Sequence, residues 1–140
     1  MLPSRHMLSD WLSGAARPPI AELLGLKLVQ AENGTVTMTL VVDRRHHNPI
    51  GTVHGGILAD LADAAMGTAV ATTLAEGETF TTTGLSLHFL EPVREGLLRG
   101  QATVVRRGRR LAYAECDILA PDGALVARAQ STCFLARPSG

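Results

Sequence analysis

The sequence predicts an α+β domain in which a curved antiparallel sheet wraps around one long central helix. A continuous helical pattern covers residues 55–75, and a strand hairpin precedes it at residues 26–42. Four further strand patterns follow the helix, near residues 79–90, 97–107, 110–120 and 124–136. This order lacks the alternation of strands and helices that builds a parallel sheet, so the helix is expected to pack on an antiparallel one.

The composition is that of one globular domain. A chain of 140 residues and 14.8 kDa fits a single domain, residues 1–140, in which residues 1–25 form an N-terminal helical segment. The hydrophobic content of 46% and the charged content of 19% are typical of a soluble protein. The formal net charge of +0 provides no long-range attraction for nucleic acid or an anionic membrane, so neither is expected as a partner.

The location of the protein is expected to be cytoplasmic. The N-terminal segment contains no continuous apolar stretch of the signal-peptide kind, and no later stretch reaches the roughly 18 apolar residues of a spanning helix. Cys116 and Cys133 do not form a Cys-x-x-Cys pair. Free thiols in a reducing compartment are therefore the simpler interpretation, with a disulfide as the alternative.

The elements before the long helix have clear boundaries. Apolar residues at helical spacing predict a first helix; they are Leu8, Trp11, Leu12 and Ala15. Pro18 and Pro19 interrupt this helix and start a second short one, which Gly25 is placed to terminate. The dipeptide Asn33-Gly34, with β-branched residues on both sides, predicts a tight hairpin turn.

Turn residues separate the later strands. They are Pro92 with Gly96, Gly108, and Pro121-Asp122-Gly123. Short turns predict that consecutive strands are antiparallel neighbours. In the last strand the small apolar side is expected to face inward; it carries Leu125, Ala127, Ala129, Ser131, Cys133 and Leu135. One face of the sheet should therefore be packed, and the other should be largely in contact with water.

The central helix has two sides at 100° per residue. The side expected to pack on the sheet carries Ile57, Leu58, Leu61, Ala64, Ala65 and Thr68. The opposite side carries Ala59, Asp63, Met66, Gly67 and Val70. Residues 55–75 contain no basic residue, although a solvent-exposed side would normally carry several charges. We therefore expect a second copy of the chain to cover this side across a two-fold axis, in a homodimer.

Two carboxylates lie within this apolar helix. Asp60 is close to the edge of the packed side and is interpreted as solvated. Asp63 faces the expected interface, where an unpaired carboxylate would lose several kcal/mol of hydration or take up a proton. Because perturbed carboxylates are common at functional sites, Asp63 is a candidate catalytic residue. The alternative is an Asp bonded to the backbone or to an arginine of the partner chain.

The start of the helix provides a second candidate group. Gly55 and Gly56 leave backbone N–H groups free at the positive end of the helix dipole, where they can stabilise an oxyanion. Asp63 lies roughly 12 Å along the axis from Gly55, too far for both to act on one carbon atom. Antiparallel central helices in a dimer would bring Gly55 of one chain beside Asp63 of the other and create two shared sites.

The motif Asn-x-x-Gly-x-x-His-Gly-Gly at residues 48–56, followed by the acid Asp63, resembles the hotdog-fold acyl-CoA thioesterases of the PaaI type, named for phenylacetate degradation. The similarity continues through LHFLEP (87–92), VVRRGRRLAY (104–113) and DGALVA (122–127), and covers residues 20–136. The resemblance implies the hotdog fold and hydrolysis of an acyl-CoA thioester without a metal or a bound cofactor.

The resemblance also implies catalytic roles. Asp63 matches the catalytic carboxylate, which acts as general base on water or as nucleophile. Gly55 matches the backbone donor to the thioester carbonyl. Asn48 matches the side chain that helps to hold that carbonyl or the water, and His54 matches a neighbouring polar support. Thr82 falls near a hydroxyl that assists the water. A turn-initiating role for Asn48 and a structural role for His54 are the alternatives.

The arginine-rich hairpin resembles the region that holds the nucleotide part of coenzyme A in this family. Its members are Arg106, Arg107, Arg109 and Arg110, whose paired N–H donors suit phosphates. A plain solvated turn is the alternative. The implied assembly is a homodimer with shared active sites, and pairing of two such dimers into a homotetramer is expected, although the sequence leaves the choice between dimer and tetramer open. The acyl group stays open between an aryl ring and a medium aliphatic chain.

Other functions are disfavoured by specific features. A metal site is not expected, because the histidines and aspartates have no helical His-x3-His or equivalent spacing. A non-catalytic acyl-CoA sensor is the main alternative, but a regulator would be expected to carry a DNA-binding segment, and the N-terminal piece is not a helix-turn-helix. A hotdog dehydratase is the third possibility, and the His-Gly-Gly with its downstream Asp does not resemble the Asp/His pair of those enzymes.

Overall fold

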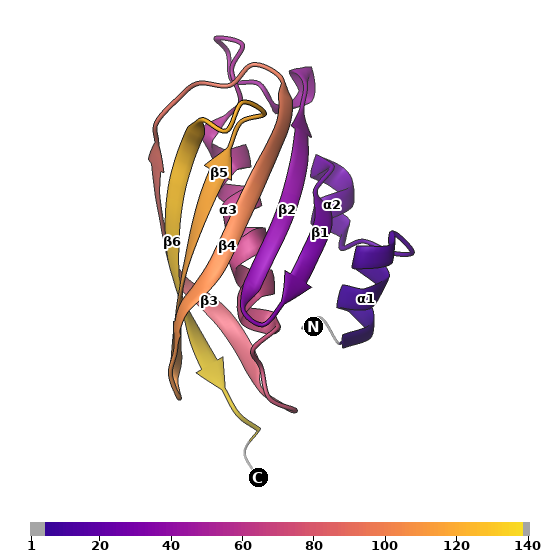
Figure 1. Ribbon diagram of the computed structural model, residues 1–140, viewed down its shortest axis with the longest axis vertical. Helices are drawn as coiled ribbons and strands as arrows, with labels where there is room; N and C mark the ends of the chain where they lie inside the picture. The colour runs from indigo at the N-terminus through magenta and orange to yellow at the C-terminus, as the bar shows by residue number, and fades with distance from the viewer. Residues whose placement is uncertain (1–4, 139–140) are drawn as a thin grey trace.

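The computed structural model describes residues 5–138, which form one six-stranded sheet with helices on and beside it (Figure 1). The helical elements are α1 (Arg5–Ser13), α2 (Pro19–Leu24), the 3-10 turn η1 (Arg44–His46) and α3 (Gly55–Ala71). The strands are β1 (Lys27–Glu32), β2 (Thr35–Val42), β3 (Thr79–Phe89), β4 (Gly96–Arg107), β5 (Leu111–Leu119) and β6 (Leu125–Ala136). The predicted order of strands and central helix is confirmed, and η1 is an element that the sequence did not predict.

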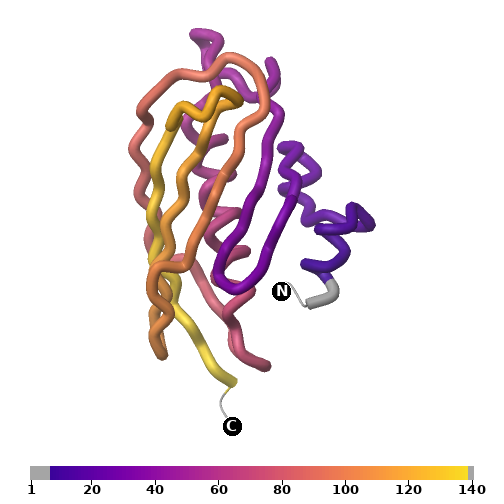
Figure 2. Tube along the Cα trace, viewed as in Figure 1, coloured from indigo at the N-terminus to yellow at the C-terminus, as the bar shows by residue number. Residues whose placement is uncertain are grey.

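The sheet has the order β1-β2-β4-β5-β6-β3, and every neighbouring pair is antiparallel. It curves around α3, which contacts all six strands, while α1 and α2 lie beside the β1 edge (Figures 1 and 2). This arrangement is the hotdog fold, as predicted. No helix within residues 5–138 combines the length and the apolar character needed to cross a membrane.

The prediction that consecutive strands are neighbours is wrong for β3 and β4. β3 pairs with β6 at one edge of the sheet, whereas β4 pairs with β2 and β5. Residues 90–95 carry the chain across the end of the sheet instead of turning back on it (Figure 2). The Val93 carbonyl accepts a 2.7 Å hydrogen bond from the Val53 N–H, and the Val93 side chain is buried. These contacts anchor the crossing beside the start of α3.

The helix end predicted at Gly25 and the turn predicted at Asn33-Gly34 are confirmed. Gly25 ends α2 in the left-handed conformation, with φ of 85°, and its N–H donates to the Ala21 carbonyl. Asn33 and Gly34 both have positive φ, 49° and 79°, which is the requirement of a type I′ hairpin turn.

The central helix ends four residues earlier than predicted, at Ala71 rather than residue 75. The Thr72 hydroxyl donates to the Ala69 carbonyl, and the Thr73 hydroxyl donates to the Val70 carbonyl, both at 2.7 Å. The Thr72 hydroxyl also accepts a 2.8 Å bond from the Gly34 N–H. Because these hydroxyls occupy carbonyls of the last turn, the helix terminates against the β1–β2 hairpin.

The sheet covers more of α3 than the periodicity predicted. Met66 and Val70, expected on the side away from the sheet, are both 0% exposed. Ile57 and Ala64, expected to be packed, are only partly buried. The curvature of the sheet explains the difference, since a wrapped sheet meets the helix over more than one flat side. What remains accessible is an open stripe formed by Ala59, Asp60, Asp63, Ala64, Gly67 and Ala71.

The two faces of the sheet differ as predicted except at the start of β6. There a register shift leaves Leu125, expected to be packed, only partly buried and buries Val126 fully. The side chains of Ala127, Ala129, Ser131, Cys133 and Leu135 on β6 are buried toward α3. The alternate residues Arg128, Gln130 and Phe134 are exposed on the outer face. Cys116 and Cys133 are both free and buried, which confirms the free-thiol interpretation.

Candidate functional site

The loop before α3 is organised by Asn48. Its side-chain oxygen accepts hydrogen bonds from the backbone N–H groups of Ile50, at 3.0 Å, and Thr52, at 3.2 Å. Its side-chain nitrogen donates to the Thr52 hydroxyl at 2.8 Å. The side-chain oxygen of Asn48 is therefore used to form the turn, which was the alternative to a role in catalysis. The second hydrogen of the Asn48 amide nitrogen has no partner among the described residues, so it could be donated to a hydrogen-bond acceptor on a ligand.

His54 is the N-cap of α3. Its Nδ1 accepts a 2.9 Å hydrogen bond from the Gly56 N–H, so this nitrogen carries no proton in that arrangement. His54 thereby satisfies the second N–H of the helix. No hydrogen-bond partner of the Gly55 N–H is found among the described residues. The first N–H thus remains available, at the positive end of a helix of 17 residues.

Phe89 covers the same helix terminus. A Cβ atom built on Gly55 would lie 3.0 Å from the Phe89 ring carbon Cζ, which is closer than ordinary packing allows. Glycine at position 55 therefore permits the ring and the backbone to approach each other. The Phe89 side chain is 57% exposed, so an aromatic surface stands directly beside the free N–H group. The sequence reasoning did not identify Phe89 as a site residue.

Asp63 lies in the middle of α3 and faces β3. The Thr82 hydroxyl is 3.4 Å from its Oδ1 and donates a long hydrogen bond. Burial raises the pKa of the Asp63 carboxyl above its ordinary value, and the bond from Thr82 opposes part of the shift. None of the ion pairs formed by the described residues includes Asp63. This carboxylate is therefore partly dehydrated and lacks a neutralising cation.

Asp60 differs from Asp63 in its surroundings. It is exposed one turn earlier on the open stripe, as predicted. Burial raises the pKa of the Asp60 carboxyl, and the negative charge of Asp63 adds to the effect. Like Asp63, it has no ion-pair partner among the described residues.

A β-bulge places Thr82 on the inner face of β3. Thr82 pairs with Cys133, but Gly84 pairs with Thr132, so Thr83 is the additional residue. Even-numbered residues face α3 before the bulge and odd-numbered residues face it afterwards. Phe80, Thr82, Leu85, Leu87 and Phe89 consequently share one face, opposite the buried side chains of β6. A strict alternation along the strand could not have placed both Thr82 and Phe89 there.

Cys133 is the other site residue that the sequence reasoning missed. Its sulfur lies 3.7 Å from the Thr82 hydroxyl oxygen and it is 1% exposed. The alternating pattern of the last strand predicted that Cys133 is buried, but it carried no information that Thr82 on β3 lies beside it. Only the pairing of β6 with β3 brings the two side chains together.

The structure does not bring every predicted site residue together. Asp63 and Thr82 are in contact, His54 and Gly55 lie at the start of α3, and Asn48 lies in the preceding loop, where its side chain bonds Ile50 and Thr52. Eight residues of helix separate Gly55 from Asp63, which corresponds to about 12 Å of rise. The two groups therefore occupy different places along the open stripe of a single chain.

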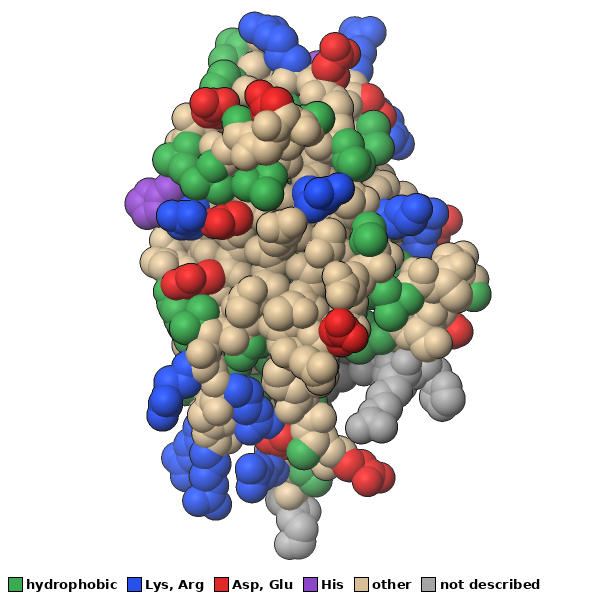
Figure 3. All heavy atoms as spheres, viewed as in Figure 1, with side chains coloured by type: hydrophobic (Ala, Val, Ile, Leu, Met, Phe, Trp, Pro, Cys, Tyr) green, Lys and Arg blue, Asp and Glu red, His purple; other side chains and the backbone are tan. Residues whose placement is uncertain are grey.

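The arginine hairpin lies near the opposite end of α3. Arg107 is committed to the protein itself, since its guanidinium bonds the buried Glu78 carboxylate and donates to the Gly108 carbonyl. Arg106, Arg109 and Arg110 are exposed at the tip between β4 and β5. Figure 3 shows basic side chains gathered at this lower end of the molecule. Three of the four arginines are thus accessible to a ligand.

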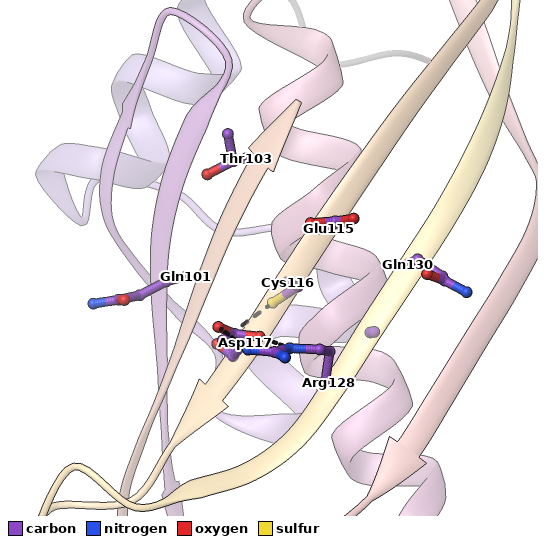
Figure 4. A pocket seen from close by; sticks show the side chains of 8 residues that line it. Gln101, Thr103, Glu115, Cys116, Asp117, Arg128 and Gln130 are labelled. Atoms are coloured by element: carbon purple, nitrogen blue, oxygen red, sulfur yellow. Dashed lines mark hydrogen bonds and ion pairs between the residues drawn. The ribbon is translucent and has the colours of Figure 1, made fainter. Parts of the chain in front are cut away.

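Two hollows on the described chain lie elsewhere. One of about 400 Å³ lies on the outer face of β4, β5 and β6, where Arg128 forms a two-pronged ion pair with Asp117 at 2.8 and 3.1 Å (Figure 4). The other, of about 1300 Å³, lies between α1 and residues 71–79. Neither is lined by Asp63 or Gly55. The predicted catalytic groups therefore do not coincide with either of these hollows.

Known proteins are similar to this chain in sequence. The sequence profile of the Thioesterase superfamily matches residues 50–127, which is more than half of the chain. The proofreading thioesterase EntH of Cronobacter turicensis is 29% identical over 110 residues, which cover 79% of this chain and 80% of that protein.

Solved structures are similar over most of the chain. A phenylacetic acid degradation-related protein of Ralstonia eutropha is 35% identical, with 91% of this chain and 98% of that chain covered and a TM-score of 0.81. A mutant of the phenylacetic acid degradation protein PaaI of Thermus thermophilus is 29% identical, with 84% and 98% covered and a TM-score of 0.78. The chain therefore belongs to the Thioesterase superfamily and is a thioester hydrolase with the hotdog fold of the PaaI type.

Proposed function

We propose that the protein hydrolyses an aryl- or medium-chain acyl-CoA thioester to the free acid and coenzyme A, with Asp63 as the reacting carboxylate. The observation that carries this proposal is the state of Asp63, which is partly buried, has a raised pKa, accepts a bond from Thr82 and pairs with no cation among the described residues. A carboxylate in this state is a stronger base than an ordinary surface aspartate.

The Gly55 N–H is proposed to stabilise the oxyanion. It has no hydrogen-bond partner among the described residues and stands at the positive end of the α3 dipole. The free amide hydrogen of Asn48 would help to hold the carbonyl or the water, and His54 would support the site by fixing the helix terminus.

Two routes are compatible with this geometry. In the base route, Asp63 takes a proton from water, the resulting hydroxide adds to the thioester carbon, and the C–S bond breaks as the thiolate leaves. In the nucleophilic route, the Asp63 oxygen attacks the carbon, the thiolate leaves, and water hydrolyses the mixed anhydride. Thr82 is placed to hold Asp63, or a water beside it, in either route.

The complete site is proposed to need two chains. Gly55 and Asp63 of one chain are about 12 Å apart along α3, and the open stripe of α3 is mostly apolar and uncovered. Antiparallel packing of two such stripes would place Gly55 of one chain beside Asp63 of the other. We therefore propose a homodimer with two shared sites, paired into a homotetramer.

Coenzyme A is proposed to contact the arginine hairpin. Arg109 and Arg110 are exposed at its tip and can offer paired donors to phosphate oxygens, as can Arg106. Arg107 is bonded to Glu78, so we assign it to holding the base of the hairpin beneath the phosphate-binding side chains.

Release of free thiol tests the activity. Wild-type protein and Asp63→Asn should be compared on phenylacetyl-, benzoyl- and short- to medium-chain aliphatic acyl-CoA. Turnover that the substitution abolishes supports the proposal, and the preferred substrate identifies the acyl group. If the ligands bind without release of thiol, the protein is an acyl-CoA sensor, and if water is added to or lost from the acyl chain, it is a dehydratase.

A hybrid dimer tests the shared site. Asp63→Asn removes the carboxylate, and Gly55→Pro removes the N–H at a helix position that tolerates proline, after a shift of the exposed Phe89 ring. Each variant alone should be inactive, but a mixture with confirmed hybrid dimers should regain activity, because one of two sites contains both intact groups. If confirmed hybrids stay inactive, the two-chain site is wrong.

A further inference from the structure

We propose that the buried thiol of Cys133 is a positioning residue, which orients the Thr82 hydroxyl so that its hydrogen points at the Asp63 carboxylate. The inference rests on the proposed function of Asp63. It concerns a side chain of β6 that does not reach the reacting atoms and acts through Thr82 alone.

The three groups form a continuous polar contact between β6, β3 and α3. The Cys133 sulfur is 3.7 Å from the Thr82 oxygen, and the same oxygen is 3.4 Å from Asp63 Oδ1. Cys133 pairs directly with Thr82 across the β6–β3 ladder, so both side chains lie on the inner face. The bulge at Thr83 begins immediately after this pair.

The number of hydrogens decides the direction of each bond. A hydroxyl has one hydrogen, and an ionised carboxylate can only accept. When Asp63 is ionised, the Thr82 hydrogen must therefore point at Asp63, and the Thr82 oxygen is left as an acceptor toward Cys133. Two consecutive hydrogen bonds result: the Cys133 thiol donates to the Thr82 oxygen, and the Thr82 hydroxyl donates to the Asp63 carboxylate.

The surroundings of the sulfur keep the thiol able to donate. Cys133 is 1% exposed, and burial raises the pKa of its thiol, while contacts with Thr82 and Ser131 oppose the shift. The negative charge of Asp63 also raises the pKa of this thiol. The protonated form, the only one with a hydrogen to donate, is therefore the one that the site favours.

The thiol is needed because the Thr82 hydroxyl could otherwise rotate away from Asp63. Without a donor at position 133, the Thr82 hydroxyl is free to turn toward other acceptors, and its bond to Asp63 is already long at 3.4 Å. A donor that occupies the oxygen lone pairs of Thr82 restricts this rotation. Asp63 is then kept in one orientation and its negative charge is stabilised, which lowers the pKa of its carboxyl toward the ordinary value.

A double-mutant cycle on kcat/KM tests the inference, with Cys133→Ala, Thr82→Val and the double variant. Loss of one net hydrogen bond predicts a decrease of about threefold to tenfold for Cys133→Ala, mostly in kcat. Because Cys133 acts only through Thr82, its substitution should have almost no further effect in the Thr82→Val protein. Cys133→Ser, which retains a donor, should recover most of the activity.

The pKa of Asp63 supplies a readout that does not need a substrate. It can be followed by NMR of carbon-13-labelled aspartate, and it should rise in both Cys133→Ala and Thr82→Val. Cys116→Ala is the matched control, because Cys116 is an equally buried free thiol, on β5 near Asp117 (Figure 4). This control should leave the pKa of Asp63 and kcat/KM unchanged.

Each outcome decides between the two proposals. Additive effects in the cycle, or an Asp63 pKa that does not change in Cys133→Ala, would overturn the positioning role and leave packing as the function of Cys133. If the wild-type protein hydrolyses acyl-CoA and Asp63→Asn does not, such a result refutes this inference alone. If Asp63→Asn retains activity, the proposed function of Asp63 is the part that fails.

Discussion

Two carboxylates near the β3 edge have opposite surroundings. The Glu78 side chain is 3% exposed, bonds Arg107, accepts a 2.7 Å bond from the Ala75 N–H and lies 3.5 Å from Arg137. Asp63 is partly buried, and among the described residues the long bond from Thr82 is the side-chain hydrogen bond that it receives. The Ala75 N–H and the arginines lower the pKa of the Glu78 carboxyl, whereas burial raises that of Asp63.

The difference separates an acid that holds the structure together from the acid that we propose to react. Glu78 joins residues before β3, the end of β4 and residues after β6, so its charge is used to hold the lower end of the sheet together. Asp63 has no such partners among the described residues, and its charge is left available for chemistry. Burial of a carboxylate alone therefore does not separate the two acids, and the presence of cations beside Glu78 does.

The largest effect is expected from Asp63→Asn. We expect turnover to fall by roughly a hundredfold or more, as for loss of a general base or nucleophile, with an unchanged or slightly higher Tm because a dehydrated charge is removed. Steady-state thiol release and thermal unfolding measure the two quantities. Asp60→Asn is the matched control one turn away and should retain near-normal turnover. Near-normal turnover of Asp63→Asn would contradict a catalytic role for Asp63 and so remove the distinction between Asp63 and Glu78.

Glu78→Gln should have the reverse profile. The substitution leaves Arg107 and Arg137 without their carboxylate, so we expect the Tm to fall by several degrees, while kcat/KM of the folded protein stays within about threefold of the wild type. Glu76→Gln, in the exposed loop two residues earlier, is the control and should leave the Tm unchanged. A Glu78→Gln protein with normal stability and lost activity would assign Glu78 to the chemistry instead.

The contributions of Glu78 and Asp63 to folding stability should also change in opposite directions with pH. The lowered pKa of Glu78 means that its contribution to stability is present above the ordinary pKa and is lost as pH falls through the lower, folded-state pKa. The raised pKa of Asp63 means that ionisation of this group opposes folding as pH rises from its ordinary pKa through the raised one. Urea unfolding of the wild type, Glu78→Gln and Asp63→Asn between acidic and neutral pH measures both contributions. Parallel stability curves for the three proteins would contradict the assignment.

The smallest effect is expected from Thr82→Val. Loss of its bond to Asp63 should lower kcat/KM by about threefold to tenfold and move the acid limb of the pH–rate profile to higher pH, because that bond lowers the pKa of Asp63. Thr83→Val is the matched control on the same strand, since the Thr83 hydroxyl bonds the Thr132 carbonyl instead. An acid limb that does not move in Thr82→Val would show that Asp63 is not the group that titrates.

Local patterns predicted the elements well. Asn33-Gly34 marked the β1–β2 turn because both positions need positive φ, and the alternation of β6 predicted its buried side because strand geometry has a period of two residues. The apolar surroundings and the glycine start of the helix made Asp63 and Gly55 candidates, and the resemblance of the motif around residues 48–56 to a known family added Asn48, His54 and Thr82.

Contacts between distant segments could not be predicted in the same way. The length of residues 90–95 suggested a hairpin, yet β3 pairs with β6, because a long-range pairing depends on packing around α3 and not on the connection itself. Arg107 was indistinguishable from Arg109 and Arg110 in the sequence, and only the position of Glu78 separates them. Cys133 gave no local sign of its contact with Thr82.

The sequence by itself therefore determined the fold class, the central helix with its Gly55 start and Asp63, and the family. The fold class and the central helix depend on residue spacing within single elements, which covalent geometry and hydrophobic periodicity control, whereas the family was indicated by the resemblance of the motif at residues 48–56. Only the tertiary structure decided which acid is neutralised, which face of α3 stays open and which side chains meet at Thr82. Those properties depend on the curvature and strand order of the sheet, which arise from packing between segments far apart in the chain.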